Sequence, residues 1–177
     1  MSIREAEMWV VCSLVILAVT EWPRQKELPL LFKMAHFGFV GLFSLMSISG
    51  VHYLLLMCIN YGGFIEIFSK NIPRSINPQF LKIIIVVYCL IGLILFFGAL
   101  RLGRFRRWGR QVVIIFSIPY SMLYPSVEVM MAGRIEMPHA GKIIWNLSLI
   151  LLSLSIAAVA MYASQRFSRY VVYLNGF

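Results

Sequence analysis

The sequence predicts an all-α integral membrane protein, a bundle of four or five transmembrane helices with short loops. Two observations predict this class. Of the 177 residues, 60% are hydrophobic and only 13% are charged, whereas soluble domains have about 45–50% apolar and about 25% charged residues. Several apolar runs also approach the roughly 20 residues that a helix needs to cross a bilayer. We therefore expect residues 1–177 to form a single transmembrane domain.

The first possible span, residues 8–20, is the shortest. It holds 13 residues between Glu7 and Glu21. A helix of this length, at about 1.5 Å per residue, covers roughly 20 Å of a hydrocarbon core about 30 Å thick. Two interpretations stay open: the segment crosses a locally thinned bilayer, or it lies in the interface.

The second span, residues 37–60, carries a ladder of small residues in its uncharged stretch FGFVGLFSLMSISG. The ladder consists of Gly38, Gly41, Ser44, Ser47 and Gly50. Steps of three residues rotate by about −60° each on an α-helix, so the ladder describes a groove that slants across the helix. In lipid, small residues favour helix association because they allow close backbone approach. The groove is predicted to pack against a helix, and three alternatives stay open: a helix of this chain, a partner helix or lipid tail, and no special role.

Residues 61–82 form the longest connection between spans, on the outer side. The stretch FIEIFSK within it is amphipathic. We expect a short interfacial helix in which Phe64, Ile65, Ile67 and Phe68 face the membrane while Glu66 and Lys70 face water.

The third span, residues 83–100, contains no charge and leads into a basic hairpin, residues 101–110. The arginines of this hairpin are Arg101, Arg104, Arg106, Arg107 and Arg110. Loops this basic stay cytoplasmic, so alternation of the spans predicts a cytoplasmic C-terminus as well. The net charge of +9 is then expected to attract anionic lipid headgroups rather than nucleic acid.

The fourth span, residues 111–133, is the most polar. Pro119 and Pro125 each favour a kink because proline removes a backbone donor. At about 100° per residue, four polar side chains share one face of this helix. They are Ser117, Ser121, Tyr124 and Glu128. Three roles stay open for the carboxylate: a proton or ion relay, a structural bond to a partner, and solvation by headgroups.

His52 of the second span is predicted to lie at a similar depth to Glu128. A histidine–glutamate pair that bridges the two spans is therefore geometrically possible. A lone histidine in a span is more often a packing residue than a proton carrier.

The last span, residues 143–163, is uncharged, and no chemistry-bearing motif appears in it or elsewhere. No nucleophile–base pair, phosphate-binding loop or dinucleotide fingerprint is present. The sequence therefore predicts a protein that is not an enzyme, with no cofactor and no metal. Copper handling is a weaker alternative, since soft ligands and a histidine gather at the outer edge. They are Met57, Cys58, Met122, Met130, Met131, Met137 and His139.

Small loops, the small-residue ladder and the lack of a catalytic motif favour one function. We expect a non-catalytic accessory or structural subunit of a larger membrane protein complex, with other membrane subunits as partners. The expected location is a bacterial inner membrane. The alternative is a small transporter or channel that uses the proline-kinked span and its polar stripe, which ends at Glu128.

Overall fold

The computed structural model describes residues 3–21, 29–70, 78–131, 139–165 and 167–169. Its elements in these ranges are all α-helices, and the described residues contain no strand. In chain order the helices are α1 (Ile3–Glu21), α2 (Leu30–Ile59), α3 (Tyr61–Lys70), α4 (Pro78–Gly103), α5 (Arg107–Met131) and α6 (Ala140–Ala163).

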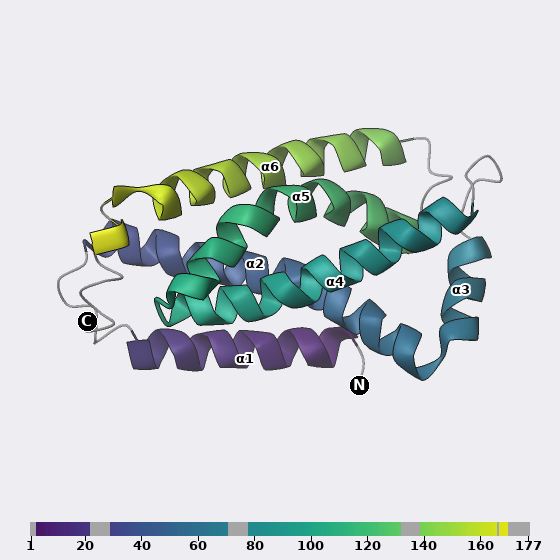
Figure 1. Cartoon of the computed structure of the whole chain (residues 1–177), viewed down its shortest axis with the longest axis horizontal. Coiled ribbons are helices and arrows are strands. Elements are labelled where there is room, and N and C mark those ends of the chain that lie inside the picture. Colours follow the sequence, from purple (N-terminus) through teal and green to yellow (C-terminus); the bar gives the residue numbers. More distant parts are fainter. Residues whose placement is uncertain (1–2, 22–28, 71–77, 132–138, 166, 170–177) are drawn as a thin grey trace.

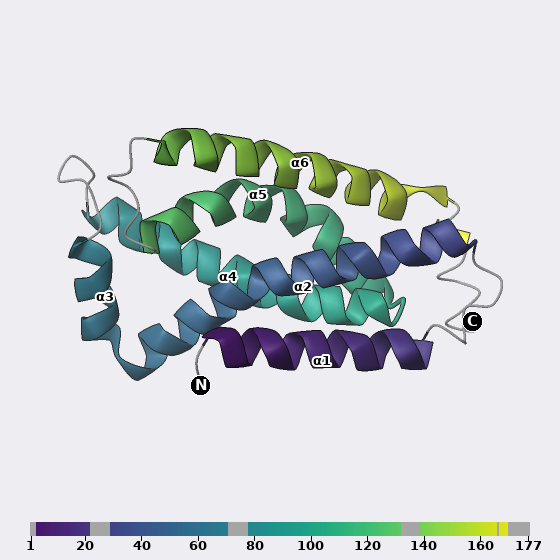
Figure 2. The same cartoon turned by 180° about the vertical axis from the view of Figure 1, so that it is seen from behind.

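The long helices run lengthwise in layers, and α3 lies crosswise at one end (Figure 1). α6 forms one outer layer and packs on α5, α2 and α4 cross in the middle, and α1 lies on the opposite outer side (Figure 2). The start of α2, the α4–α5 turn and the end of α6 share one end of the bundle, which we call the turn end. The other end, with α3 and the starts of α4 and α6, is the α3 end.

Three of the described helices are long and apolar enough to cross a membrane, namely Leu30–Ile59, Lys82–Gly103 and Gly141–Ala163. This finding confirms the all-helical class and the presence of helices able to span a bilayer. α5 is not among the three, in keeping with its serines, tyrosines, prolines and Glu128. In α1 the apolar part is Val11–Glu21, which is short for a span.

The helices extend beyond the apolar runs that predicted them. α2 begins at Leu30 rather than residue 37, directly after Pro29, whose φ of −54° already suits a helix start. α4 and α5 likewise continue into the predicted basic hairpin. As a result, only residues 104–106 connect them, instead of the expected ten-residue hairpin 101–110.

Asn60 separates α2 from the crosswise helix α3. Its backbone leaves the helical region, with φ −146° and ψ 74°, and its Oδ1 accepts a hydrogen bond from the Gly63 amide at 2.9 Å. This is an N-cap contact that starts a new helix in a new direction. Phe64 of α3 is only 4% exposed and packs near the Tyr53 ring at 6.3 Å between centroids. The expectation that Phe64 faces the membrane is therefore wrong, because α3 turns this side chain into the bundle. Glu66 is exposed, as expected.

The α4–α5 turn closes with a Schellman motif. The Arg106 amide donates to the Arg101 carbonyl at 3.0 Å, and the Phe105 amide donates to the Leu102 carbonyl at 2.8 Å. These bonds satisfy carbonyls that the end of α4 would otherwise leave unpaired. The motif needs a left-handed residue after the helix, a position that glycine usually fills, and here Phe105 adopts φ 55°.

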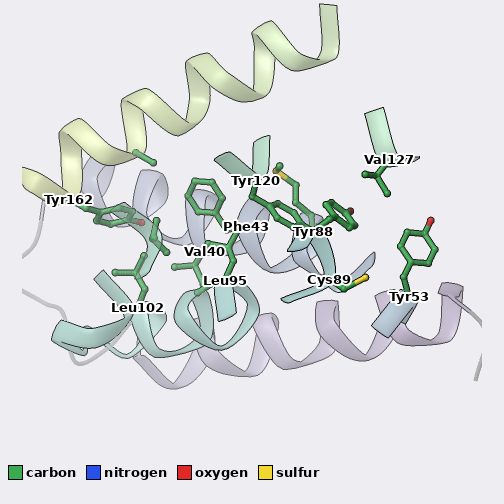
Figure 3. Close-up of a cluster of buried hydrophobic side chains, with 14 of the residues drawn as sticks. Val40, Phe43, Tyr53, Tyr88, Cys89, Leu95, Leu102, Tyr120, Val127 and Tyr162 are labelled. Carbon is green, nitrogen blue, oxygen red and sulfur yellow. Dashed lines mark hydrogen bonds between the residues drawn. The ribbon is translucent and has the colours of Figure 1, made fainter. Parts of the chain in front are cut away.

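The core of the bundle lies between α2, α4 and α5 (Figure 3). Val40 and Phe43 of α2 meet Leu95 of α4 there, and all three are fully buried. α5 bends around this core (Figures 1 and 2), and Pro119 and Pro125, which favour kinks, both lie inside this helix.

Candidate functional site

Two glycines, Gly50 of α2 and Gly92 of α4, form a close helix contact at the centre of the bundle. A Cβ atom placed on Gly50 would lie 3.1 Å from the Gly92 Cα and 2.9 Å from the Tyr120 hydroxyl of α5. Tyr120 Oη in turn donates a hydrogen bond to the Met46 carbonyl at 3.0 Å. Three helices therefore meet at one point, which requires both glycines because any side chain would force the backbones apart.

The rest of the small-residue ladder faces different surroundings along α2. Ser47 is fully buried and donates to the Phe43 carbonyl at 2.6 Å, and Ser44 is also fully buried. Gly41 faces α1, since a Cβ there would lie 4.0 Å from the Leu14 Cδ1. Around Gly38 nothing in the described part of the chain lies within 4 Å of such a Cβ. The ladder thus winds round the helix, and its half from Ser44 to Gly50 is buried among the helices of this chain.

Glu128 is the acceptor of a polar network near the α3 end. Tyr53 Oη donates to Glu128 Oε2 at 3.2 Å, and Tyr88 Oη donates to Oε1 at 3.3 Å. Ser49 Oγ lies 2.6 Å from Tyr88 Oη, and the Tyr88 ring stacks on Tyr120 at 4.8 Å. Figure 3 shows these three tyrosines along the helix crossing. The carboxylate therefore joins α5 to both α2 and α4.

His52 lies beside this network. Its side chain is half-buried, and its ring centroid is 6.0 Å from that of Tyr53. The sequence suggested that His52 pairs with Glu128, but in the structure the hydroxyls of Tyr53 and Tyr88 bind this carboxylate. Both tyrosines were overlooked, although Tyr53 follows His52 directly and Tyr88 is the one tyrosine in the uncharged run 83–100.

The other members of the polar stripe on α5 point to other neighbours. Ser121 Oγ donates to the Ser117 carbonyl at 2.6 Å and forms a short hydrogen bond with Ser155 Oγ of α6. Ser117 Oγ is buried and has no hydrogen-bond partner among the described residues. Tyr124 is half-buried, with its ring 6.2 Å from that of Tyr120. The stripe therefore divides between a contact with α6 and the network around Glu128.

An aromatic cluster closes the turn end. His36 of α2 is fully buried and stacks on Phe105 at 4.3 Å between ring centroids. Tyr162 Oη lies 3.3 Å from His36 Nδ1, and the fully buried Phe167 packs against Phe105 at 5.7 Å. The buried Phe105 ring explains how a left-handed phenylalanine is held in the turn. Sequence analysis did not find this cluster, because its members come from four separate segments.

The five predicted arginines have two different environments. Arg110 is half-buried and turns inward: its Nε donates to the Tyr162 carbonyl at 2.7 Å and its Nη1 donates to Ser168 Oγ at 3.1 Å. Its guanidinium carbon also lies 5.9 Å from the centre of the Phe167 ring. The other four are exposed, and they are Arg101, Arg104, Arg106 and Arg107.

Within the described ranges, no group of three or more His, Cys, Asp or Glu side chains is placed to hold a metal ion. The side chains of Met130, Met131 and Met137, part of the copper alternative, lie outside the described residues. Comparison with protein-family models, with curated proteins and with solved structures finds no match to this chain. A function therefore has to come from the geometry of the described residues.

Proposed function

We propose that this protein is a non-catalytic subunit of a larger membrane complex in a bacterial inner membrane. In this proposal α2, α4, α5 and α6 cross the bilayer, with α1 as a possible fifth span. α5 is compatible with lipid surroundings because its polar side chains form hydrogen bonds inside the bundle. Tyr120 bonds to the Met46 carbonyl and Ser121 to Ser155. Glu128 accepts hydrogen bonds from Tyr53 and Tyr88. The basic turn end is the cytoplasmic end, since the arginines concentrate there.

The observation that carries the proposal is the outward face of α6. This helix packs mainly on α5, and its inward side buries Ser155, Ala158 and Tyr162. The opposite side has residues that lie within an arc of about 80° around the helix, at about 100° per residue. These residues are all exposed, and they are Asn146, Ile150, Ser153, Ala157 and Ala160.

This outward face has the composition of a helix contact surface in membranes. Ser153 and Ala157 are four residues apart, so they form a small-xxx-small pair that lets another helix approach closely. Asn146 adds an amide that can form hydrogen bonds across a helix interface. A face exposed only to lipid tails gains nothing from small or polar side chains. The arrangement therefore favours a partner helix on α6.

The contacts of Glu128 and Ser121 favour a structural role over the transporter alternative. Glu128 accepts hydrogen bonds from two helices, which suits a tie between spans. Ser121 donates to a backbone carbonyl, which cannot pass a proton onward along the stripe. The polar groups of α5 thus serve packing rather than a continuous path.

The test is quantitative co-purification of the tagged full chain from its own membrane in a mild detergent. We expect a fixed set of membrane chains in constant ratio. Ala157→Leu should reduce their recovery severalfold, because the larger side chain blocks close approach. Ile156→Leu is the matched control, since Ile156 is exposed on the same helix but points about 80° away from the centre of the outward face.

Two outcomes contradict the proposal. One is a wild-type chain that purifies as a monomer or as a homo-oligomer alone, which would favour the transporter. The other is equal recovery of partners with the Ala157→Leu and Ile156→Leu variants, which would exclude the outward face of α6 as the contact surface.

A further inference from the structure

We propose that the α4–α5 turn is a preformed binding surface for the phosphate groups of anionic phospholipids. The surface consists of the exposed side chains Arg101, Arg104, Arg106, Arg107 and Trp108. It goes beyond the proposed subunit role, because it requires only that α4 crosses the bilayer and does not depend on any partner chain.

Hydrogen bonds and packing hold the backbone of the turn, from which the guanidinium groups project. The Schellman hydrogen bonds to Arg101 and Leu102 close it, and the buried side chain of Phe105 anchors it between His36 and Phe167. A rigid scaffold lowers the conformational entropy that binding would otherwise cost.

Glycines hold α4 and α5 together directly behind the turn. A Cβ on Gly109 would collide with the backbone of Leu102, and one on Gly98 would collide with the Val112 side chain. The two helices therefore touch almost backbone to backbone there. This close contact fixes the direction in which α5 leaves the turn, and with it the positions of Arg107 and Trp108.

The division of the arginines identifies which charges are available to a ligand. Arg110 is engaged within the fold through Tyr162 and Ser168. Arg101, Arg104, Arg106 and Arg107 instead point out from the turn into solvent. Four cations within seven residues repel one another and have no evident value for folding. Guanidinium groups bind phosphate through two parallel hydrogen bonds, which makes phosphate the fitting counter-charge.

The position of the turn selects a lipid phosphate. The uncharged run 83–100 of α4 leads directly into Arg101, so when α4 crosses the bilayer the turn reaches the level of the headgroups. Trp108 is 51% exposed beside the arginines, and exposed tryptophan favours the membrane–water interface. The apolar helix lies at the level of the lipid tails, the aromatic ring at the interface and the cations at the level of the headgroups. This order matches the parts of an anionic phospholipid.

The experiment titrates detergent-purified full-length protein with phosphatidylglycerol or with phosphatidylcholine and measures bound lipid by native mass spectrometry. We expect tighter binding of phosphatidylglycerol, weakened by salt. The double variant Arg104→Gln/Arg107→Gln should weaken this binding about 25-fold, since each surface arginine contributes about fivefold. The control Lys82→Gln/Lys142→Gln removes the same charge from exposed residues near the α3 end and should change binding less than twofold.

Three results would overturn the proposal. The first is a wild type that binds both lipids equally, a result that needs no variant and so does not depend on variant folding. The second is an equal loss of affinity in the turn variant and the control, which would reduce the effect to overall charge. The third is displacement of the lipid by inorganic phosphate at equal concentration, which would assign the surface to a soluble anion.

Discussion

α4 and α6 are both apolar helices long enough to cross a bilayer, yet they have opposite places in the molecule. In the most apolar stretch of α4, 39% of the residues are buried, against 11% in α6. α4 contains Gly92 and Gly98, which allow close contact with α2 and α5, whereas the span 143–163 of α6 contains no glycine. Hydropathy therefore indicates which helices belong in lipid, and the glycines distinguish the central helix α4 from the outer helix α6.

The largest expected effect comes from Gly92→Leu. The new side chain would meet the Gly50 Cα and the Tyr120 ring, so we expect a loss of about 2–3 kcal/mol of stability, as for overpacked cores. Ala157→Leu on α6 is the matched control and should leave the stability of the isolated chain unchanged. Thermal denaturation of both variants in the same detergent measures the difference. Equal melting temperatures would show that the crossing at Gly92 is not the centre of the bundle.

Replacing Glu128 tests the polar tie between α5 and the α2–α4 pair. Glu128→Leu leaves the hydroxyls of Tyr53 and Tyr88 without their acceptor, at a cost of about 1–3 kcal/mol. Glu128→Gln keeps an acceptor oxygen and should assemble and function nearly normally. The fraction of monodisperse protein and its melting temperature compare the two. A well-assembled but inactive Gln variant would instead raise the transporter alternative above the subunit role.

A smaller effect is expected at the buried hydrogen bond between Ser121 of α5 and Ser155 of α6. Ser155→Ala removes the partner of Ser121 and should cost about 1 kcal/mol. Ser153→Ala on the exposed side of α6 is the control, because Ser153 donates only to its own helix at the Leu149 carbonyl. If the two variants have the same melting temperature, the Ser121–Ser155 hydrogen bond contributes nothing measurable to holding α6.

The orientation of the bundle can be tested with no expected change in stability. A cysteine in place of the exposed Arg106, in a chain whose Cys12, Cys58 and Cys89 are replaced, should react with a membrane-permeant maleimide. It should resist an impermeant reagent added to intact cells, because the proposed topology, which rests on the positive charge of the turn, places the turn in the cytoplasm. Labelling by the impermeant reagent would invert the proposed topology.

Much of the fold could be predicted from the sequence, because apolar length and turn residues are local signals. The helix runs and the short helix α3 follow from them. Phe64 was misplaced because amphipathicity indicates which residues share a face, but not whether that face meets lipid or protein. The direction of α3, and with it the place of Phe64, depends on the Asn60 cap, which is a single hydrogen bond from the Gly63 amide to the Asn60 side chain.

The site was less predictable because its contacts join distant segments. The stripe on α5 was identified from its spacing, yet its partners Tyr53, Tyr88 and Ser155 lie on three other helices. Likewise, nothing local distinguishes Arg110 from its neighbours. Its inward direction depends on where the end of α6 lies. Residue type indicated which groups need partners, and only the packing of the helices supplied those partners.

The most direct test of the central claim is site-specific photocrosslinking of α6 in the native membrane. A photoreactive amino acid in place of Ala157 should give one discrete protein adduct, because in the proposed complex the outward face of α6 contacts a partner helix. The same amino acid in place of Ile156 should give mainly lipid adducts. Lipid adducts at both positions would contradict the account, since the outward face of α6 would then be a lipid-facing surface and not a contact with another subunit.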